Sequence, residues 1–247
     1  MRGVIANQLQ FSKIPGCSYA YWISNATINN FSNSKMENVM VTRTGMATAD
    51  NDKFLKFWFE VTNKRIYFTA TDYINAMYTG FKWFPYNKGG DFRRWYGNNE
   101  YIVNWENNGS EVKNNKDPKT GRIRSHNYNG EYSFEEGLTW TELSSGVFSL
   151  RYCPKGYLFD SAGAKAFIKE KNNTWYILGC LNSKVAQHYL DFLAPTLHYK
   201  PGDINLVPFI KDKESKVEKI STQNVDITKN DWDSFETSWD FKKHPLI

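Results

Sequence analysis

Residues 82–105 hold the side chains best suited to binding a ligand. This segment, KWFPYNKGGDFRRWYGNNEYIVNW, places eight aromatic rings among Lys82, Lys88, Arg93 and Arg94. Cations neutralise phosphates and flat rings stack on exposed bases, so the alternation is typical of a nucleic-acid-binding surface. A buried strand would not carry these charges, because an unpaired buried charge costs several kcal/mol. The alternative is that the rings are core residues and the cations form a solvated rim.

The composition is that of a mildly basic globular protein. The chain has 247 residues, of which 40% are hydrophobic, 23% charged and 17% aromatic, too many rings for a disordered chain. The 31 Lys and Arg against 26 Asp and Glu give a net charge of +5, which is compatible with a nucleic-acid partner but does not require one. No apolar stretch approaches the roughly 18 residues of a membrane span, so we expect no membrane contact.

The three cysteines give no sign of a disulfide framework or a zinc ribbon. Cys17, Cys153 and Cys180 are odd in number and contain no C-x-x-C pair. We therefore expect a reducing, cytoplasmic location. The start of the chain has no signal peptide and the end stops on an apolar pair, so we also expect a piece excised from a longer chain.

Catalytic motifs are missing from the sequence. It has no G-x-G-x-x-G, P-loop, H-E-x-x-H or G-x-S-x-G pattern. Structural or surface roles are expected for the histidines, which are not spaced as metal ligands: His126, His188, His198 and His244. A nuclease-like set of Asp91, Glu111 and Lys113 is the remaining enzymatic alternative, although such triples arise by chance in a charged chain.

The periodicity in the first two thirds of the chain predicts mainly strands and loops. Residues 50–62 start with helix-capping residues and predict a helix, whereas residues 64–70 alternate and predict a strand. Residues 107–129, rich in Asn, Gly and Lys, predict a long exposed basic loop. Short apolar runs in residues 139–159 predict strands joined by glycine turns.

The last third predicts more helix. Residues 182–195 predict a helix between a capping Asn and a terminating Pro, and the charged residues 211–219 predict the start of another. Residues 175–179 and 203–209 predict strands. We expect an α+β fold, with a twisted, mostly antiparallel sheet and flanking helices concentrated in the C-terminal third. Residues 1–210 would form a recognition domain, and residues 211–247 a helical tail packed on it or on an absent domain.

Several longer motifs resemble a known family in order over nearly the whole chain. They are NVMVTRTGMATADNDKFLKFWFEV, residues 82–109, GLTWTELSSGVFSLRYCPKGYLFDSAGAKAF, ILGCLNSKVAQHYLDFLAPTLHYKPGDINLVPF and DWDSFETSWDF. The combination resembles the C-terminal region of BREX-type adenine-specific DNA methyltransferases, the PglX family of phage-defence systems. Parts of it resemble more loosely the target recognition domains of restriction–modification enzymes.

The resemblance implies a recognition module without a catalytic domain. In that family an upstream domain binds S-adenosylmethionine and holds a flipped adenine with an N-P-P-Y type motif. This sequence has no Pro-Pro pair and no glycine-rich cofactor motif. The expected parent is thus an adenine-N6 methyltransferase that uses S-adenosylmethionine, whereas this chain has no cofactor. Expected partners are double-stranded DNA, the upstream methyltransferase domain, other defence-system proteins and phage inhibitors.

Two segments, residues 82–96 and 139–151, are predicted to face the duplex. Lys88, Arg93 and Arg94 would bind phosphates or guanine edges. Base readers would be Asn87, Thr139 and Thr141, ring contacts Tyr86 and Tyr96, and the other DNA-facing residues Lys82, Trp140 and Arg151. The loop of residues 113–124 would add sequence-independent attraction. Residues 48–52 either cap a helix or contribute to the site.

Two binding alternatives remain open beside the nuclease. A docking or scaffold module would hold other defence-system proteins through the Trp-rich tail and would ignore DNA. A carbohydrate-binding module would use exposed Trp and Tyr platforms, without needing the basic residues. Its binding would be nearly independent of salt.

Overall fold

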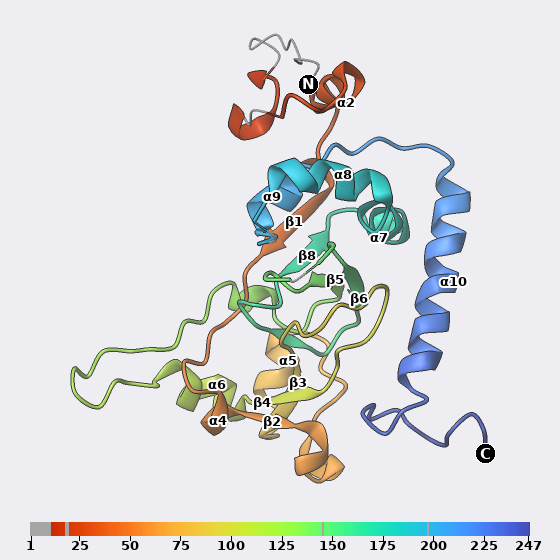
Figure 1. The fold of residues 1–247 in the computed structure, drawn as a ribbon. Helices are drawn as coiled ribbons and strands as arrows, with labels where there is room; N and C mark the ends of the chain where they lie inside the picture. The colour runs from red at the N-terminus through yellow and green to blue at the C-terminus, as the bar shows by residue number, and fades with distance from the viewer. Residues whose placement is uncertain (1–10, 18–19, 145, 197) are drawn as a thin grey trace.

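The structure is a computed structural model that describes residues 11–17, 20–144, 146–196 and 198–247, with only the backbone of Cys17. Its strands form two four-stranded sheets, one above the other in Figure 1. In the first sheet every pair is antiparallel, in the order β1 (Met40–Arg43), β8 (Lys165–Ile168), β5 (Gly137–Trp140) and β6 (Leu150–Cys153).

The second sheet contains the predicted binding segment. Its order is β2 (Leu55–Phe57), β4 (Tyr101–Asn104), β3 (Trp83–Asn87) and β7 (Leu158–Phe159). The β3–β7 pair is parallel and the other two are antiparallel. All five residues of β3 are buried, because the strand lies between β4 and β7 and has side chains packed on both faces.

Helices precede the strands, lie between them and also follow them. Those before and between the strands are α2 (Asn25–Asn29), α3 (Met36–Val39), α4 (Asn51–Phe54), α5 (Tyr73–Met77) and α6 (Glu106–Lys113). After the sheets come α7 (Thr174–Leu181), α8 (Lys184–Leu193), α9 (Pro201–Asn205) and α10 (Glu214–Trp232). The α+β class, the mostly antiparallel strands and the helical C-terminal third are confirmed, although the strands form two sheets. No helix in the described ranges is long and apolar enough to cross a membrane.

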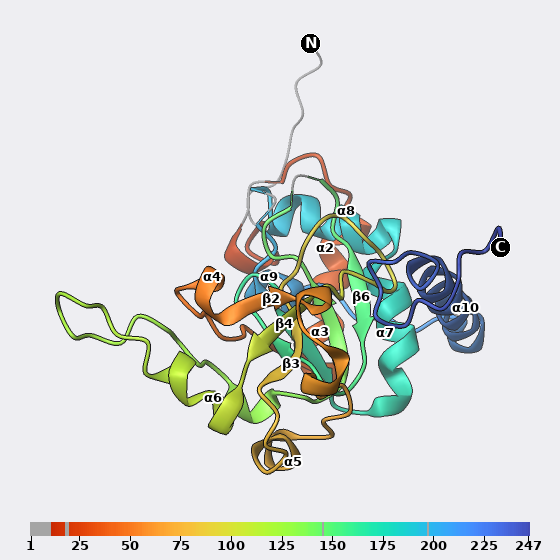
Figure 2. The same cartoon turned by 90° about the horizontal axis from the view of Figure 1, so that it is seen from below.

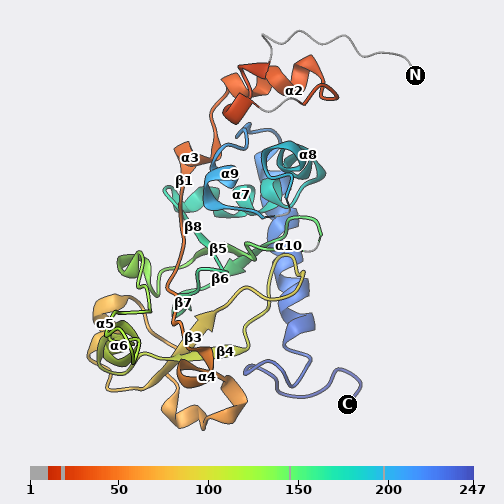
Figure 3. The same ribbon diagram turned by 60° about the vertical axis from the view of Figure 1, so that its left-hand side comes forward.

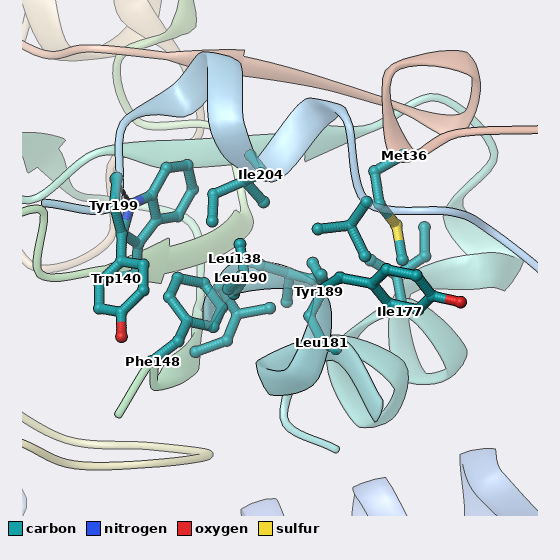
Figure 4. Packing of buried hydrophobic residues seen from close by; sticks show 14 of the residues in the cluster. Met36, Leu138, Trp140, Phe148, Ile177, Leu181, Tyr189, Leu190, Tyr199 and Ile204 are labelled. Atoms are coloured by element: carbon teal, nitrogen blue, oxygen red, sulfur yellow. Dashed lines mark hydrogen bonds between the residues drawn. The ribbon is translucent and has the colours of Figure 1, made fainter. Parts of the chain in front are cut away.

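Each sheet has its own hydrophobic core. The first core lies between β5 and the helices α7, α8 and α9, where Trp140, Phe148 and Tyr199 pack together (Figure 4). The Trp140 indole also donates a 2.8 Å hydrogen bond to the Tyr199 carbonyl. The second core holds many of the rings of residues 82–105, among them Phe84, Tyr86 and Trp105. Those rings therefore stabilise the fold and do not form a platform.

One predicted strand of the last third is a helix and another is partly helical. Residues 175–179 lie in α7, because an apolar run of this length fits a helix buried on most sides as well as a strand. Residues 203–209 begin inside α9, which has Pro201 in its first turn, where the missing N–H costs nothing. The predicted helix of residues 182–195 is confirmed as α8, capped by Ser183.

Two predictions in the first third are also corrected. The helix expected over residues 50–62 lasts only for α4, where Asp50 caps the Lys53 N–H, and the chain then enters β2. Pairing with β4 overrides the local helix signal there. Residues 64–70 form no strand; the chain leaves a 3₁₀ turn and makes one isolated bridge, between Ile66 and Trp83.

The tail of residues 211–247 runs past both sheets. Helix α10 packs along α7 and runs beside both sheets (Figures 1 and 3). Beyond it, Trp239 contacts the rings of Phe68 and Tyr157, and the Thr237 carbonyl accepts a 2.9 Å hydrogen bond from the Trp58 indole. The tail thereby ties the second sheet to the helices of the first.

Helix α10 can lie this close to α7 because residue 179 is glycine. A β-carbon at Gly179 would collide with Ser221 Oγ and lie 2.8 Å from Val217 Cγ1. We expect Gly179→Ala to lower the free energy of unfolding by about 1–3 kcal/mol, measured by chemical denaturation. The control is Gly202→Ala, where the β-carbon meets open space. Equal stability of the two variants would contradict this account of the helix pair.

Candidate nucleic-acid interface

A hairpin of residues 115–124 that is paired at one isolated β-bridge, the basic hairpin, projects from the body on the side opposite α10 (Figures 1 and 2). Lys116 pairs with Ile123, and the Asp117 N–H donates to the Arg122 carbonyl. The turn between the strands is closed by Asp117, whose carboxylate accepts from the N–H groups of Lys119 and Thr120. The loop predicted for residues 107–129 is therefore α6 followed by this ordered hairpin.

The basic hairpin presents cations with little compensating charge. Its basic side chains are all exposed and form no ion pair among the described residues: Lys116, Lys119, Arg122 and Arg124. The one acid, Asp117, is occupied in the turn, and hydrogen bonds from Thr120 and Lys119 lower its pKa. Ile123 is 53% exposed between two arginines. This charge pattern attracts a polyanion.

The base of the hairpin is tied to the loop of residues 47–50. Asn115 donates a 2.9 Å hydrogen bond to the Thr48 carbonyl, and Arg124 donates to the Ala49 carbonyl at 3.1 Å. The backbones of Ala47 and His126 pair through two further hydrogen bonds. Ala49 has a φ of 57°, a left-handed conformation that persists in a non-glycine residue only when its surroundings enforce it. The hairpin and the loop thus form one braced unit.

Two adjoining hollows lie beside this loop. The first, of about 340 Å³, is lined by residues 47–51, Lys88, Asp160 and Ser161. The second, of about 380 Å³, is lined by Asn51, Asp52, Leu55, Lys56, Phe57, Glu60, Lys88 and Tyr101. Asn51 and Lys88 belong to both linings, so they mark the junction of the two hollows.

Lys88 is the predicted DNA-contacting residue that lines both hollows. Its ammonium lies 3.1 Å from the Asp160 carboxylate, which also accepts a 2.6 Å hydrogen bond from the Tyr86 hydroxyl. Burial and Asp160 together raise the pKa of Tyr86 well above its ordinary value, so the phenol stays a donor. Tyr86 is fully buried and hydrogen-bonds the carboxylate that pairs with Lys88, so it does not reach a ligand in this conformation.

The predicted base readers Asn87 and Thr139 are buried partners of each other. The Asn87 amide donates to the Thr139 hydroxyl, which donates in turn to the Ala164 carbonyl at 3.0 Å. Trp140 is likewise fully buried. Asn87 and Thr139 link the two sheets, and burial keeps these side chains from a base in this conformation.

Arg151 is a buried brace for the loop of residues 88–98. Its guanidinium, with no exposed surface, donates to the Arg93 carbonyl at 3.3 Å and to the Thr141 hydroxyl at 3.4 Å. Thr141 donates in turn to the Gly90 carbonyl at 2.8 Å. Burial lowers the pKa of Arg151 to about 10, so the group stays charged at neutral pH. The two predicted segments do meet, but mainly through buried contacts.

The remaining predicted residues lie away from the hairpin. Arg93 forms an ion pair with Asp231 and lies over the Trp232 ring at 4.9 Å, so the tail occupies it. Tyr96 is buried, and burial raises its pKa to about 12.

The last two predicted cations are partly exposed. Lys82 pairs with Glu106 at 3.6 Å, and Arg94 lies 5.5 Å from the centre of the exposed Phe92 ring. Phe92 is the one ring of residues 82–105 that is mainly exposed. Because Lys88 and Arg93 are paired with acids, Arg94 is the cation of residues 88–98 without an ion-pair partner in the described structure.

Glu100, at the end of the same loop, predicts a pH effect on stability. Burial, with a further contribution from Asp91, raises the pKa of Glu100 above its ordinary value. The folded chain therefore holds this proton more tightly than the unfolded chain, and stability is lost as pH rises through the folded pKa. We expect the melting temperature of Glu100→Gln to equal that of the wild type at pH 4 and to exceed it at pH 7. The same difference in melting temperature at both pH values would contradict this.

Residues 48–52, which include Asn51, were predicted either to cap a helix or to contribute to the site, but the exposed ring stack beside Asn51 was not predicted. Phe57 stacks on Tyr101 at 4.8 Å and on Phe59 at 5.3 Å, and Phe59 is 60% exposed. The helix-capping residues that precede α4 were the sequence feature that could have indicated this part of the surface, because they form a polar turn next to the ring stack.

The contacts of Asp91, Glu111 and Lys113, the nuclease-like triple, do not bring these side chains together in one site. Lys113 lies over the Trp105 ring at 4.9 Å and donates to Asn108 at 3.1 Å, while Glu111 accepts from Asn104. Asp91 lies in the other loop. Within the described part of the chain, no group of three or more His, Cys, Asp or Glu side chains is placed to hold a metal ion.

Two relatives match almost the whole chain. Adenine-specific methyltransferase PglX of Lacticaseibacillus casei (strain Zhang) is 40% identical over 242 residues, which cover 97% of this chain and 20% of the relative. Adenine-specific methyltransferase BrxX of Escherichia coli O9:H4 (strain HS) is 38% identical over 242 residues, which cover 97% of this chain and 19% of the relative. The chain is similar to one region of each of these two methyltransferases.

The resemblance inferred from the motifs is thereby confirmed. The chain spans about one fifth of the length of these relatives, so it is similar to a part of them and not to the whole. No family model matches the chain.

Proposed function

We propose that this chain is the DNA recognition module of a cytoplasmic, phage-defence adenine-N6 DNA methyltransferase, and that it contacts double-stranded DNA through the basic hairpin. The observation that carries the proposal is the projecting hairpin, with four exposed cations and its single acid occupied in the turn. In this proposal the projecting hairpin reaches the phosphates that flank a groove of the duplex. The names of the relatives, adenine-specific methyltransferases, support DNA as the ligand.

The proposal divides the surface by role. Cations of the hairpin contact phosphates and supply affinity, whereas the hollows beside Lys88 lie where the duplex would pass the hairpin base. Arg93 and Arg94, on the side of α10, are assigned no direct role in this contact. The buried residues Tyr86, Asn87 and Arg151 support the exposed ones.

No methyl-transfer step is assigned to this chain. S-adenosylmethionine, which the family resemblance implies for the parent protein, is nucleotide-like and needs close approach of the backbone, usually at glycines. The linings of the two hollows contain no glycine, so these residues do not fit the cofactor. In this proposal the cofactor and the catalytic centre belong to another domain of a longer chain.

Salt dependence of binding tests the proposal. The purified chain is titrated against a pool of labelled DNA duplexes by fluorescence anisotropy at about 50 and 200 mM salt. Several phosphate contacts should make the affinity fall tens-fold or more across that range. Affinity that stays flat with salt, or no binding at the lower salt concentration, would overturn the proposal in favour of a docking module.

A further inference from the structure

Asn51 and Lys88 stand at the junction of the two hollows, on the side of the molecule that carries the basic hairpin. Asn51 is the exposed first residue of α4, and Lys88 follows the last residue of β3 with 26% of its side chain exposed. Both residues line both hollows. They are therefore placed to contact the same bound group.

The amide of Asn51 is held in one orientation. The Thr48 hydroxyl donates a 2.8 Å hydrogen bond to Asn51 Oδ1. Because the carbonyl side of the amide is occupied, its Nδ2 group is the part left for a ligand, and no described side chain accepts from it. Asn51 thus has two N–H donors that no described side chain uses, whereas its carbonyl oxygen already accepts one hydrogen bond.

Lys88 is also a directed donor. Its ion pair with Asp160 offsets its charge, and Asp160 is fixed by the Tyr86 hydroxyl and by the Ala162 N–H at 2.7 Å. One N–H of the ammonium points to Asp160 and the others remain available. Lys88 therefore differs from the hairpin cations, which act mainly through charge.

The loop that carries Thr48 is rigid enough to preserve this arrangement. Ala49 keeps its left-handed conformation between the hydrogen bonds that Asn115 and Arg124 make to the loop carbonyls. Strain held in this way is a feature of preorganised sites. The hairpin base and the donor pair are consequently coupled through one short loop.

We propose that Asn51 and Lys88 form a donor pair that binds one hydrogen-bond-accepting group of the DNA. That group is either a phosphate oxygen or the edge of a guanine, which presents two acceptors, N7 and O6, in the major groove. The inference rests on the proposed function, because it assumes that the duplex lies along the hairpin. It adds a directional contact to the electrostatic one.

Asn51→Asp tests the donor role. The variant keeps the size of the side chain and an acceptor for Thr48, but removes both N–H donors. The matched control is Asn172→Asp, which makes the same charge change at an exposed position in the 3₁₀ turn of residues 171–173. We expect Asn51→Asp to bind DNA about tenfold or more weakly than the control. Equal affinity of the two variants would overturn the inference.

Asn51→Ala separates the lost donor from added repulsion, because it removes the amide without adding charge. A loss of about tenfold relative to wild type supports the donor role, and wild-type affinity overturns it. Thermal melting of each variant shows whether the fold is intact. A loss confined to duplexes with guanine at one position, reproduced by 7-deazaguanine, identifies the base edge; a uniform loss identifies a phosphate.

The outcomes also separate this inference from the proposed function. If the wild-type chain binds DNA with steep salt dependence but tolerates both Asn51 variants, only the donor pair is wrong. If the wild-type chain does not bind DNA, the proposed function fails and the donor pair with it.

Discussion

Replacing Lys116, Lys119, Arg122 and Arg124 together with Gln is expected to lower the affinity for duplex DNA by about a hundredfold or more at about 100 mM salt. Each cation that neutralises a phosphate releases condensed counterions, and the four side chains are exposed with no ion-pair partner in the described structure. The slope of log affinity against log salt should flatten by roughly three to four. Anisotropy titrations at several salt concentrations measure both quantities.

The control removes the same charge elsewhere. Four other exposed lysines, chosen on the helical side of the molecule, are replaced with Gln: Lys184, Lys200, Lys216 and Lys219. This variant should lose far less affinity and keep nearly the wild-type slope. Equal losses in the two quadruple variants would mean that DNA is attracted by the overall charge and not by the hairpin.

Trp140→Ala is expected to lower the free energy of unfolding by about 3–5 kcal/mol. The indole has no exposed surface, packs beside Phe148 and donates to the Tyr199 carbonyl, so its removal leaves a cavity and a buried acceptor without its donor. Chemical denaturation measures the loss. The free energy of unfolding of a native protein is only about 5–15 kcal/mol, so this variant should be close to the limit at which the chain still folds.

The conservative variant separates stability from recognition. Trp140→Phe keeps a ring in the core and should cost less, while DNA affinity stays at the wild-type level because the residue does not reach the surface. A folded Trp140→Ala protein that has lost DNA binding selectively would contradict the buried role.

The charge pattern of residues 82–105 predicted a surface, and most of its rings proved to be core. Strand β3 is buried on both faces, so its side chains do not alternate between polar and apolar as those of a half-exposed strand do. The cations lie at the strand end and in the loop that follows, where Asp160 and Asp231 pair with Lys88 and Arg93. Those partners are distant in sequence, so local patterns do not reveal the pairing.

Local composition did predict the exposed basic segment, but not its shape. Asn, Gly and Lys indicated an exposed loop, whereas the hairpin depends on the pairing of Lys116 with Ile123 and on the anchoring of its base to Thr48. Arg151 was predicted to face the DNA but is fully buried. Arginine is rarely buried, so its side chain was expected at the surface. The contact that holds it inside, a hydrogen bond to the Arg93 carbonyl, cannot be recognised from the sequence.

Site-specific photo-crosslinking tests most directly whether the basic hairpin touches DNA. A photoreactive amino acid is placed at Thr120, the exposed tip of the hairpin, and in a second protein at Gln223, exposed on α10. We expect bound duplex DNA to crosslink from position 120 and not from position 223. Crosslinks from position 223 alone, or from neither position while DNA is bound, would contradict the proposed interface.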